Sequence, residues 1–154
     1  MRRVLLAFAL GLVAAWLAVA TAGRNPVVCH LQGSLPDRHC TPGVRGLFTA
    51  DRVCPLGPRG RLPDNLVAAV YDVYGIDPRV RALYRPDELI PRQLGGGLRS
   101  RNIWPEPTFR KPGPGAKRAL EQRLRQLVCS GRLSLRVAQN DISNDWVAAY
   151  RRFH

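Results

Sequence analysis

An uncharged apolar run near the N-terminus most restricts what this chain can fold into. Met1, Arg2 and Arg3 form a short positive head, and residues 4–22 (VLLAFALGLVAAWLAVATA) carry no charge. Small residues at 18–22 match an A-x-A cleavage pattern, which predicts a signal peptide. The run also approaches the length of a membrane span, so an uncleaved N-terminal anchor is the alternative. In either case we expect the remainder to be exported, either secreted or periplasmic, or tethered to the membrane by residues 4–22.

The chain has 154 residues, which allows one domain with a core large enough to fold alone. Its formal net charge is +13, and Lys111 and Lys117 are its only lysines, so the excess is almost all arginine. A basic field attracts polyanions such as nucleic acid, anionic lipid or acidic glycans. The same excess is also typical of a solvated surface in an arginine-biased composition. Charge alone therefore identifies no site and no fold.

Four cysteines follow the apolar run: Cys29, Cys40, Cys54 and Cys129. An even number in an exported chain predicts disulfides, and four cysteines allow three pairings. The segment between Cys40 and Cys54 is rich in Gly and Pro, and such a segment gains most from a covalent staple. We therefore favour Cys40–Cys54, with Cys29–Cys129 as the second bond.

Zinc is an alternative use of two of these cysteines, because Cys29-His30 and His39-Cys40 place thiols beside imidazoles. Zinc sites do use Cys and His at close spacing. The two pairs lack the usual C-x-x-C knuckle, however, and oxidation would compete for the thiols. We expect His30 and His39 to be ordinary surface residues.

The N-terminal half divides into an irregular arm and a helix. Residues 23–62 are dominated by Gly, Pro, Arg and polar residues, which indicates an arm with one short hairpin. The domain proper is expected over residues 63–154. Asp64 is the expected N-cap of its first helix, whose apolar residues repeat at helical spacing until Gly75 ends it.

The C-terminal half predicts two short strands followed by two helices. Residues 84–107 suggest a strand, a Gly-rich loop and a second strand. An apolar stripe predicts a helix over 116–130, and Ser134 is a good N-cap for a last helix. Trp104 and Trp146 are expected in the core.

A strand, loop, strand and helix in this order form the layout of a ββα-metal nuclease site. Phosphodiester hydrolysis needs a base to activate water and a cation to stabilise charge on the phosphate. In that layout an acidic residue at the end of the first strand holds the metal, and a neighbouring histidine is the base. An asparagine near the second strand supports the loop, and a histidine or asparagine on the helix completes the metal ligands.

The segment PDELIPRQLGGGLRSRNIWPEP resembles the D-H-L-I-P-L-x-L-G-G…N-L-W-P-E-P signature of small secreted bacterial proteins described as HNH-endonuclease-like. The likeness extends to CTPG at residues 40–43 and, in the helical tail, to LVCSG at 127–131 and DWVAAY at 145–150. It covers roughly residues 37–151. The resemblance implies an α+β fold, with a small HNH-like ββα element packed on two to three helices and an irregular arm stapled by disulfides. It also implies DNA or RNA as partner and, in an active enzyme, a divalent metal such as Mg²⁺, Mn²⁺ or Zn²⁺.

The resemblance also assigns roles to single positions. Asp87 falls on the family's aspartate, the expected metal ligand, and Glu88 falls where the family has its catalytic histidine. Asn102 falls on the family's asparagine, and Gly95 and Gly96 fall on paired glycines that let the loop turn.

Three further residues join the candidate site. Glu121 matches an acidic helix position and is a second candidate metal ligand. Arg125 stands where many relatives have a histidine and cannot bind a cation, so we expect it to hold a phosphate or to form a salt bridge. Arg92 is assigned the same role. Glu106 is expected to cap or pair locally, with a place in the site as the alternative.

Glu88 and Arg125 leave the activity open. Glutamate has a reference pKa of about 4.3 and is a weak base near pH 7 unless burial or a neighbouring charge raises that pKa.

Three hypotheses about function follow. The first is an exported nucleic-acid-binding domain without hydrolysis. In it Asp87, Glu88 and Arg125 form a salt-bridge cluster that replaces the metal, so no cofactor is needed. The second is an active, metal-dependent endonuclease without sequence preference. The third is a basic envelope protein that binds other polyanions. The sequence indicates no particular small-molecule partner, and a membrane enters only through the uncleaved anchor.

Overall fold

The computed structural model describes residues 28–154, so the expected signal peptide or anchor at residues 1–22 lies outside the described residues. Among the helices of residues 28–154, none combines the length and apolar character needed to span a bilayer. The fold is α+β, as expected, with a two-stranded antiparallel sheet, several helices and two disulfides.

The sheet is the element that positions the candidate site. Strand β1 (Tyr84–Glu88) pairs with β2 (Ile103–Pro107), and the register sets Arg85 opposite Glu106 and Asp87 opposite Trp104. All five residues of β2 are buried, whereas β1 is partly open on one face. The strand, loop and strand expected over residues 84–107 are therefore present.

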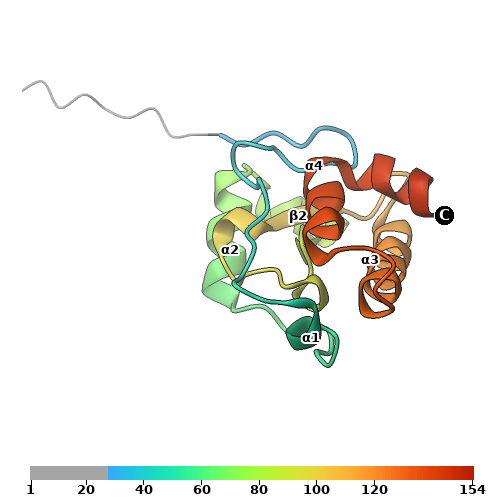
Figure 1. Ribbon diagram of the computed structural model, residues 1–154. Coiled ribbons are helices and arrows are strands. Elements are labelled where there is room, and N and C mark those ends of the chain that lie inside the picture. The colour runs from blue at the N-terminus through green and yellow to red at the C-terminus, as the bar shows by residue number, and fades with distance from the viewer. Residues whose placement is uncertain (1–27) are drawn as a thin grey trace, which may run out of the picture.

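Helices surround this sheet. They are α1 (Ala50–Val53), α2 (Asp64–Val73), α3 (Pro114–Cys129) and α4 (Leu135–Phe153), with short 3₁₀ helices η1 (Pro78–Leu83), η2 (Arg92–Leu94) and η3 (Ser100–Asn102). Figure 1 shows α3 and α4 packed against each other on one side of the strands, with α2 on the other side. The three long helices agree with the apolar periodicity of the sequence.

Of the two helix caps predicted from the sequence, one is confirmed and one is wrong. Ser134 caps α4 by accepting a hydrogen bond from the Val137 N–H at 3.3 Å, as expected. Asp64 does not cap α2, because the N-cap position is taken by Pro63. Proline has a fixed φ that suits the residue before the first turn, so Asp64 becomes the first helical residue. At this position its carboxylate interacts favourably with the positive end of the helix dipole. It also forms an ion pair with Arg61.

Helix α4 is broken near its middle, whereas its apolar pattern predicts one continuous helix. Asp145 has non-helical angles (φ −161°, ψ 94°), and its Oδ1 accepts a hydrogen bond from the Ala148 N–H at 2.9 Å. Asp145 therefore acts as an N-cap inside a continuous apolar pattern. An aspartate after Ser143 and Asn144 is a recognisable capping signal that the periodicity concealed.

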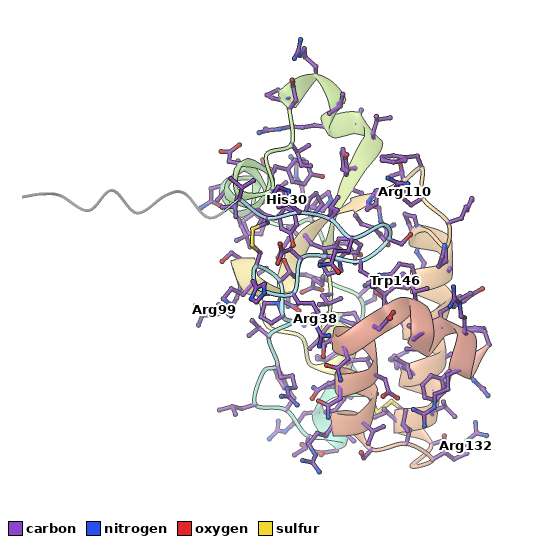
Figure 2. The ribbon with its side chains drawn as sticks, turned by 90° about the horizontal axis from the view of Figure 1, so that it is seen from above. His30, Arg38, Arg99, Arg110, Arg132 and Trp146 are labelled. Atoms are coloured by element: carbon purple, nitrogen blue, oxygen red, sulfur yellow. A yellow bond between two sulfur atoms is a disulfide. The ribbon has the colours of Figure 1, made fainter. Side chains whose placement is uncertain are left out.

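A single hydrophobic core joins the sheet, the helices and the arm. Trp104 and Trp146 are fully buried, which confirms their expected place in the core. Cys29 and Val53 from the arm belong to the same core cluster. In Figure 2, Trp146 lies against the helices, whereas Arg99 and Arg132 point outward at the edge of the molecule. The core and both disulfides of the described part lie within residues 29–149.

The expected disulfide pairing is wrong. The bonds join Cys29 to Cys40 and Cys54 to Cys129, with Cα–Cα distances of 6.0 and 5.7 Å. The segment that ends at Cys54 is packed rather than unsupported, because α1 buries Val53 and contacts α3. This contact brings Cys54 to the C-terminal end of α3, where Cys129 lies.

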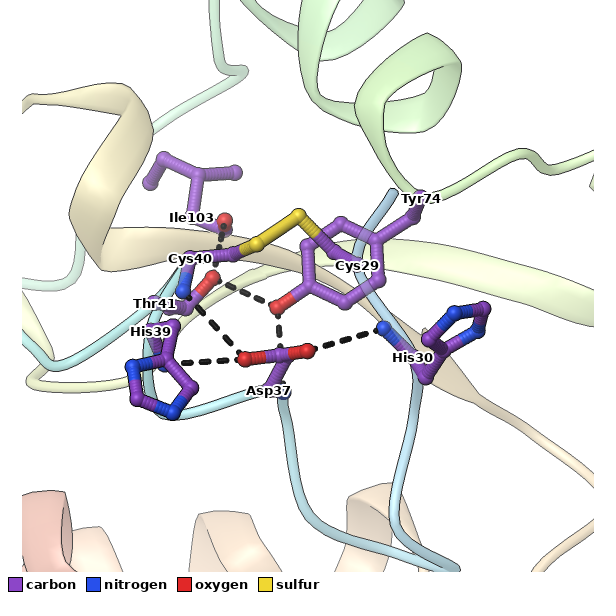
Figure 3. The surroundings of a disulfide bond; sticks show 8 residues. All are labelled: Cys29, His30, Asp37, His39, Cys40, Thr41, Tyr74 and Ile103. Carbon is purple, nitrogen blue, oxygen red and sulfur yellow. Dashed lines mark hydrogen bonds between the residues drawn. A yellow bond between two sulfur atoms is a disulfide. The ribbon is translucent and has the colours of Figure 1, made fainter. Parts of the chain in front are cut away.

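The Cys29–Cys40 loop is closed around Asp37 (Figure 3). The Asp37 carboxylate accepts backbone hydrogen bonds from His30, His39 and Cys40. These hydrogen bonds hold the pKa of Asp37 below its ordinary value, the largest effect coming from the His30 N–H. The zinc alternative fails here, because the two sulfurs are bonded to each other and are not free thiolates.

Candidate functional site

A cleft of about 280 Å³ opens over the end of β1 and the first half of α3. Its walls carry four arginines and three carboxylates, namely Arg59, Arg85, Arg92 and Arg118 with Asp87, Glu88 and Glu121. Four of the predicted site residues, Asp87, Glu88, Arg92 and Glu121, therefore line this cleft. Apart from Arg59, which comes from the arm, these side chains project from the sheet, the η2 loop and α3.

A buried lysine lies beneath the cleft. Lys117 is fully buried, and its ammonium contacts Asp87 Oδ2 at 2.7 Å and Glu121 Oε1 at 2.5 Å. It also donates to the backbone carbonyl of Glu88 at 2.8 Å. All three N–H donors are thus satisfied, as a buried ammonium requires. Burial acts to lower the pKa of Lys117, but the Asp87 and Glu121 carboxylates outweigh it and leave that pKa above its ordinary value.

The predicted metal ligands do not fit a divalent ion in this arrangement. Asp87 and Glu121 both face the Lys117 ammonium, which lies between them where a shared metal would have to bind. Asp87 is further engaged by the Arg85 guanidinium at 3.2 Å and by the Trp104 indole N–H at 3.2 Å. Within residues 28–154 no group of three His, Cys, Asp or Glu side chains is placed to hold a metal.

Glu88 reaches the cleft but both of its oxygens are occupied. Oε1 accepts from Arg59 Nε at 2.6 Å, and Oε2 accepts from the Arg92 backbone N–H at 3.2 Å. Burial raises the pKa of Glu88 above its ordinary value, although Arg59 opposes the shift. Through these two hydrogen bonds Glu88 connects the η2 loop to the arm. A catalytic role for Glu88 stays a prediction.

Glu106 is the least satisfied carboxyl group beneath the cleft. It is 1% exposed, and its Oε2 accepts from Arg85 Nε at 2.6 Å across the two strands. Its Oε1 is buried without a hydrogen-bond partner. Burial, reinforced by the nearby Asp87 charge, raises the pKa of Glu106 to about 7. The cross-strand pair with Arg85 matches the expected local pairing and also places Glu106 in the cluster.

The glycine loop between the strands is held by Asn102. The Asn102 side chain accepts from the backbone N–H groups of Val44 and Ile90 and donates to the carbonyls of Ile90 and Gly97. These contacts are those expected of a loop-supporting asparagine. Any part of Asn102 in catalysis stays a prediction.

The paired glycines are required by the tightness of the same loop. Gly95 has a φ of +77°, which favours glycine. A Cβ at Gly96 would lie 1.7 Å from the Ile90 carbonyl oxygen. The expected role of both glycines therefore agrees with the geometry.

Arg125 lies outside the cluster, contrary to expectation. Its Nη2 donates to the Cys54 carbonyl at 2.6 Å, and it forms no ion pair with Asp87 or Glu88. Arg125 follows Lys117 by two helical turns, roughly 12 Å along α3, which places it beside the disulfide. A salt-bridge cluster does exist, but its cations are Lys117, Arg85 and Arg59.

Arg92 and Arg118 complete the cleft. Both line it, and within residues 28–154 neither side chain forms an ion pair or a hydrogen bond. The salt-bridge alternative for Arg92 is therefore not observed, and its phosphate-binding alternative stays a prediction.

Lys117 is the most deeply buried of the site residues that sequence reasoning missed, which also include Arg59, Arg85 and Arg118. Its signal was present, because Lys117, Leu120, Leu124 and Val128 recur at helical spacing and are all buried on α3. Lys117 also precedes Glu121 by four residues, a spacing that brings opposite charges together on a helix.

No protein-family model matches this chain, and no curated protein or solved structure shows significant similarity to it. The HNH-like resemblance therefore stays a prediction from the sequence motif.

Proposed function

We propose that this chain is a nucleic-acid-binding domain related to HNH nucleases, in which the Lys117 ammonium takes the place of the catalytic metal and hydrolysis is absent. The observation that carries the proposal is the contact of this ammonium with both Asp87 and Glu121. Removing a buried cation from two carboxylates costs several kcal/mol, so a metal would have to displace a group that is already well bound.

Binding is assigned to the rim of the cleft. Arg59 and Arg85 are neutralised by the carboxylates of Glu88, Asp87 and Glu106, so they contribute little free positive charge. Among residues 28–154, Arg92 and Arg118 have no such partners, and they supply the cationic groups that a phosphate backbone would contact. Phosphate contacts of this kind give salt-dependent binding without base specificity.

The binding test compares two pairs of arginines that carry the same charge. Arg92→Gln/Arg118→Gln should weaken binding of residues 24–154 to a DNA duplex and lower the slope of log affinity against log salt by about 2. Arg136→Gln/Arg151→Gln removes two exposed arginines from α4, away from the cleft, and should change both quantities much less. Equal effects of the two pairs, or equal binding to heparin and DNA, would contradict cleft-directed nucleic-acid binding.

The hydrolysis test uses plasmid DNA and RNA with Mg²⁺, Mn²⁺ or Zn²⁺. We expect no cleavage above a no-protein control. Glu88→His alone should not restore it, because Lys117 would still lie between Asp87 and Glu121. Cleavage that needs metal and is lost in Asp87→Ala would support the active nuclease and overturn the proposal.

A further inference from the structure

Exposed apolar side chains lie on two adjacent loops outside the cleft. Leu47 is fully exposed at 105% of its reference area, and Phe48 and Leu98 are 47% and 39% exposed. The antiparallel pairing of Arg45 with Gly96 sets Leu98 opposite Gly43, away from Leu47. We call Leu47 and Phe48 the apolar tip. No residue of the apolar tip lines the cleft.

The loop that carries the apolar tip is held in place by backbone hydrogen bonds to the loop that precedes Leu98. The Gly46 N–H donates to the Gly95 carbonyl at 2.7 Å, and the Gly97 N–H donates to the Val44 carbonyl at 2.8 Å. The Phe48 ring lies over Gly46, where a Cβ would come within 2.4 Å of the ring. Leu47 therefore projects from a fixed turn.

Exposed arginines lie on the loop of the apolar tip and on the loop that pairs with it. Arg45 and Arg52 lie on the first loop and on α1, and Arg99 and Arg101 follow Leu98 on the second. All four are exposed, and none forms an ion pair among the described residues. Figure 2 shows Arg99 pointing away from the body of the molecule. Asp51 is the only acidic residue in segments 44–52 and 97–101.

We infer that the apolar tip docks on bilayers that contain anionic lipids. A protruding leucine with arginines on its own loop and on the paired loop matches an interface where hydrocarbon lies just beneath a layer of phosphates. In this geometry Leu47 enters the interface, and the flanking arginines contact headgroup phosphates. Phosphate binding by a nucleic acid would use the arginines but would gain little from an exposed Leu47. The charge complementarity therefore favours a lipid surface over a nucleic acid.

The test uses residues 24–154, which contain the described core and both disulfides; the absence of free thiols and a cooperative thermal transition would verify folding. Vesicles contain either phosphatidylcholine alone or phosphatidylcholine with an equal amount of phosphatidylglycerol. We expect sedimentation with the anionic vesicles only. Leu47→Ser should weaken this binding roughly tenfold, because an apolar side chain no longer enters the interface. Leu83→Ser, at another exposed leucine, should not.

A fluorescence readout locates the contact. Tryptophan placed by Leu47→Trp should shift its emission to the blue on anionic vesicles, whereas Leu83→Trp should not. Three results would overturn the inference: no binding to anionic vesicles, binding unaffected by Leu47→Ser, or a blue shift for Leu83→Trp alone. DNA binding, measured on the same variants, should be unchanged by Leu47→Ser, so this inference and the proposed function can fail separately.

Discussion

At the scale of single residues, the cluster beneath the cleft holds one carboxyl group more than its cations can balance. Asp87, Glu88, Glu106 and Glu121 face Arg59, Arg85 and Lys117. The surplus falls on Glu106, whose Oε1 has no partner and whose pKa is raised by burial to about 7. A proton on Glu106 would bring the cluster close to neutrality.

Glu106 should make stability depend on pH. Its pKa rises from 4.5 in the unfolded chain to about 7 in the folded one, so folding favours the protonated form. This contribution is complete below about pH 4.5 and is lost as the pH rises through about 7. The loss is at most about 3.5 kcal/mol, since one pKa unit corresponds to about 1.4 kcal/mol.

Urea unfolding at about pH 5 and about pH 8 measures this effect, with Glu106→Gln as the variant. The wild type should lose stability at the higher pH, and Glu106→Gln should lose less. Part of the loss should remain, because burial also raises the pKa values of Glu88 and Glu121. Identical losses in the two proteins would show that Glu106 is not the titrating group.

At the scale of elements, the loop between β1 and β2 depends on Asn102. Asn102→Ala would leave two buried N–H groups and two carbonyls without their side-chain partner. We expect a loss of at least about 3 kcal/mol in the free energy of unfolding, because buried polar groups without partners are costly. Asn144→Ala, at an exposed asparagine on α4, should change it by less than about 0.5 kcal/mol. Thermal and urea unfolding would compare the two, and similar losses would contradict the role of Asn102.

The elements were largely predictable, because their signals are local. Apolar periodicity and the stops at Gly75 and Gly131 place α2, α3 and α4, and prolines with glycines mark the two strands. The helix break at Asp145 and the start of α2 depend on which of several possible capping residues the tertiary fold uses. The spacing of apolar residues along the sequence does not determine which residue becomes the cap.

The site was only partly predictable, because its partners come from distant segments. The motif brings Asp87 and Glu88 to the cleft, whereas Asn102 holds the adjacent loop and does not line the cleft. Arg59 belongs to the arm and meets Glu88 only after the chain folds. Lys117 was missed because a charged residue is not expected on a buried helical face, unless its partners are known.

At the scale of the whole molecule, the two disulfides differ in the length of chain they constrain. Cys54–Cys129 spans 75 residues and Cys29–Cys40 spans 11. The chain-entropy model gives losses of about 4.5 and about 3 kcal/mol on removing them. Replacing Cys54 and Cys129 by alanine should therefore lower the thermal midpoint more than replacing Cys29 and Cys40. The reverse order, measured by calorimetry, would mean that the short loop around Asp37 is the main stabilising closure.

The two disulfides are consistent with an oxidising compartment, and export stays a prediction from residues 1–22. Pairing could not be predicted because it depends on how α1 packs against α3, which the spacing of the cysteines does not determine. The proposed function and the inferred lipid contact use different residues of one basic domain.

Mn²⁺ binding followed by electron paramagnetic resonance tests the central claim most directly, namely that Lys117 takes the place of the metal. The wild-type residues 24–154 should show only weak binding, equal to that of Asp87→Asn, because the ammonium already lies between Asp87 and Glu121. One tight Mn²⁺ site per chain in the wild type, lost in a folded Asp87→Asn variant, would contradict the claim.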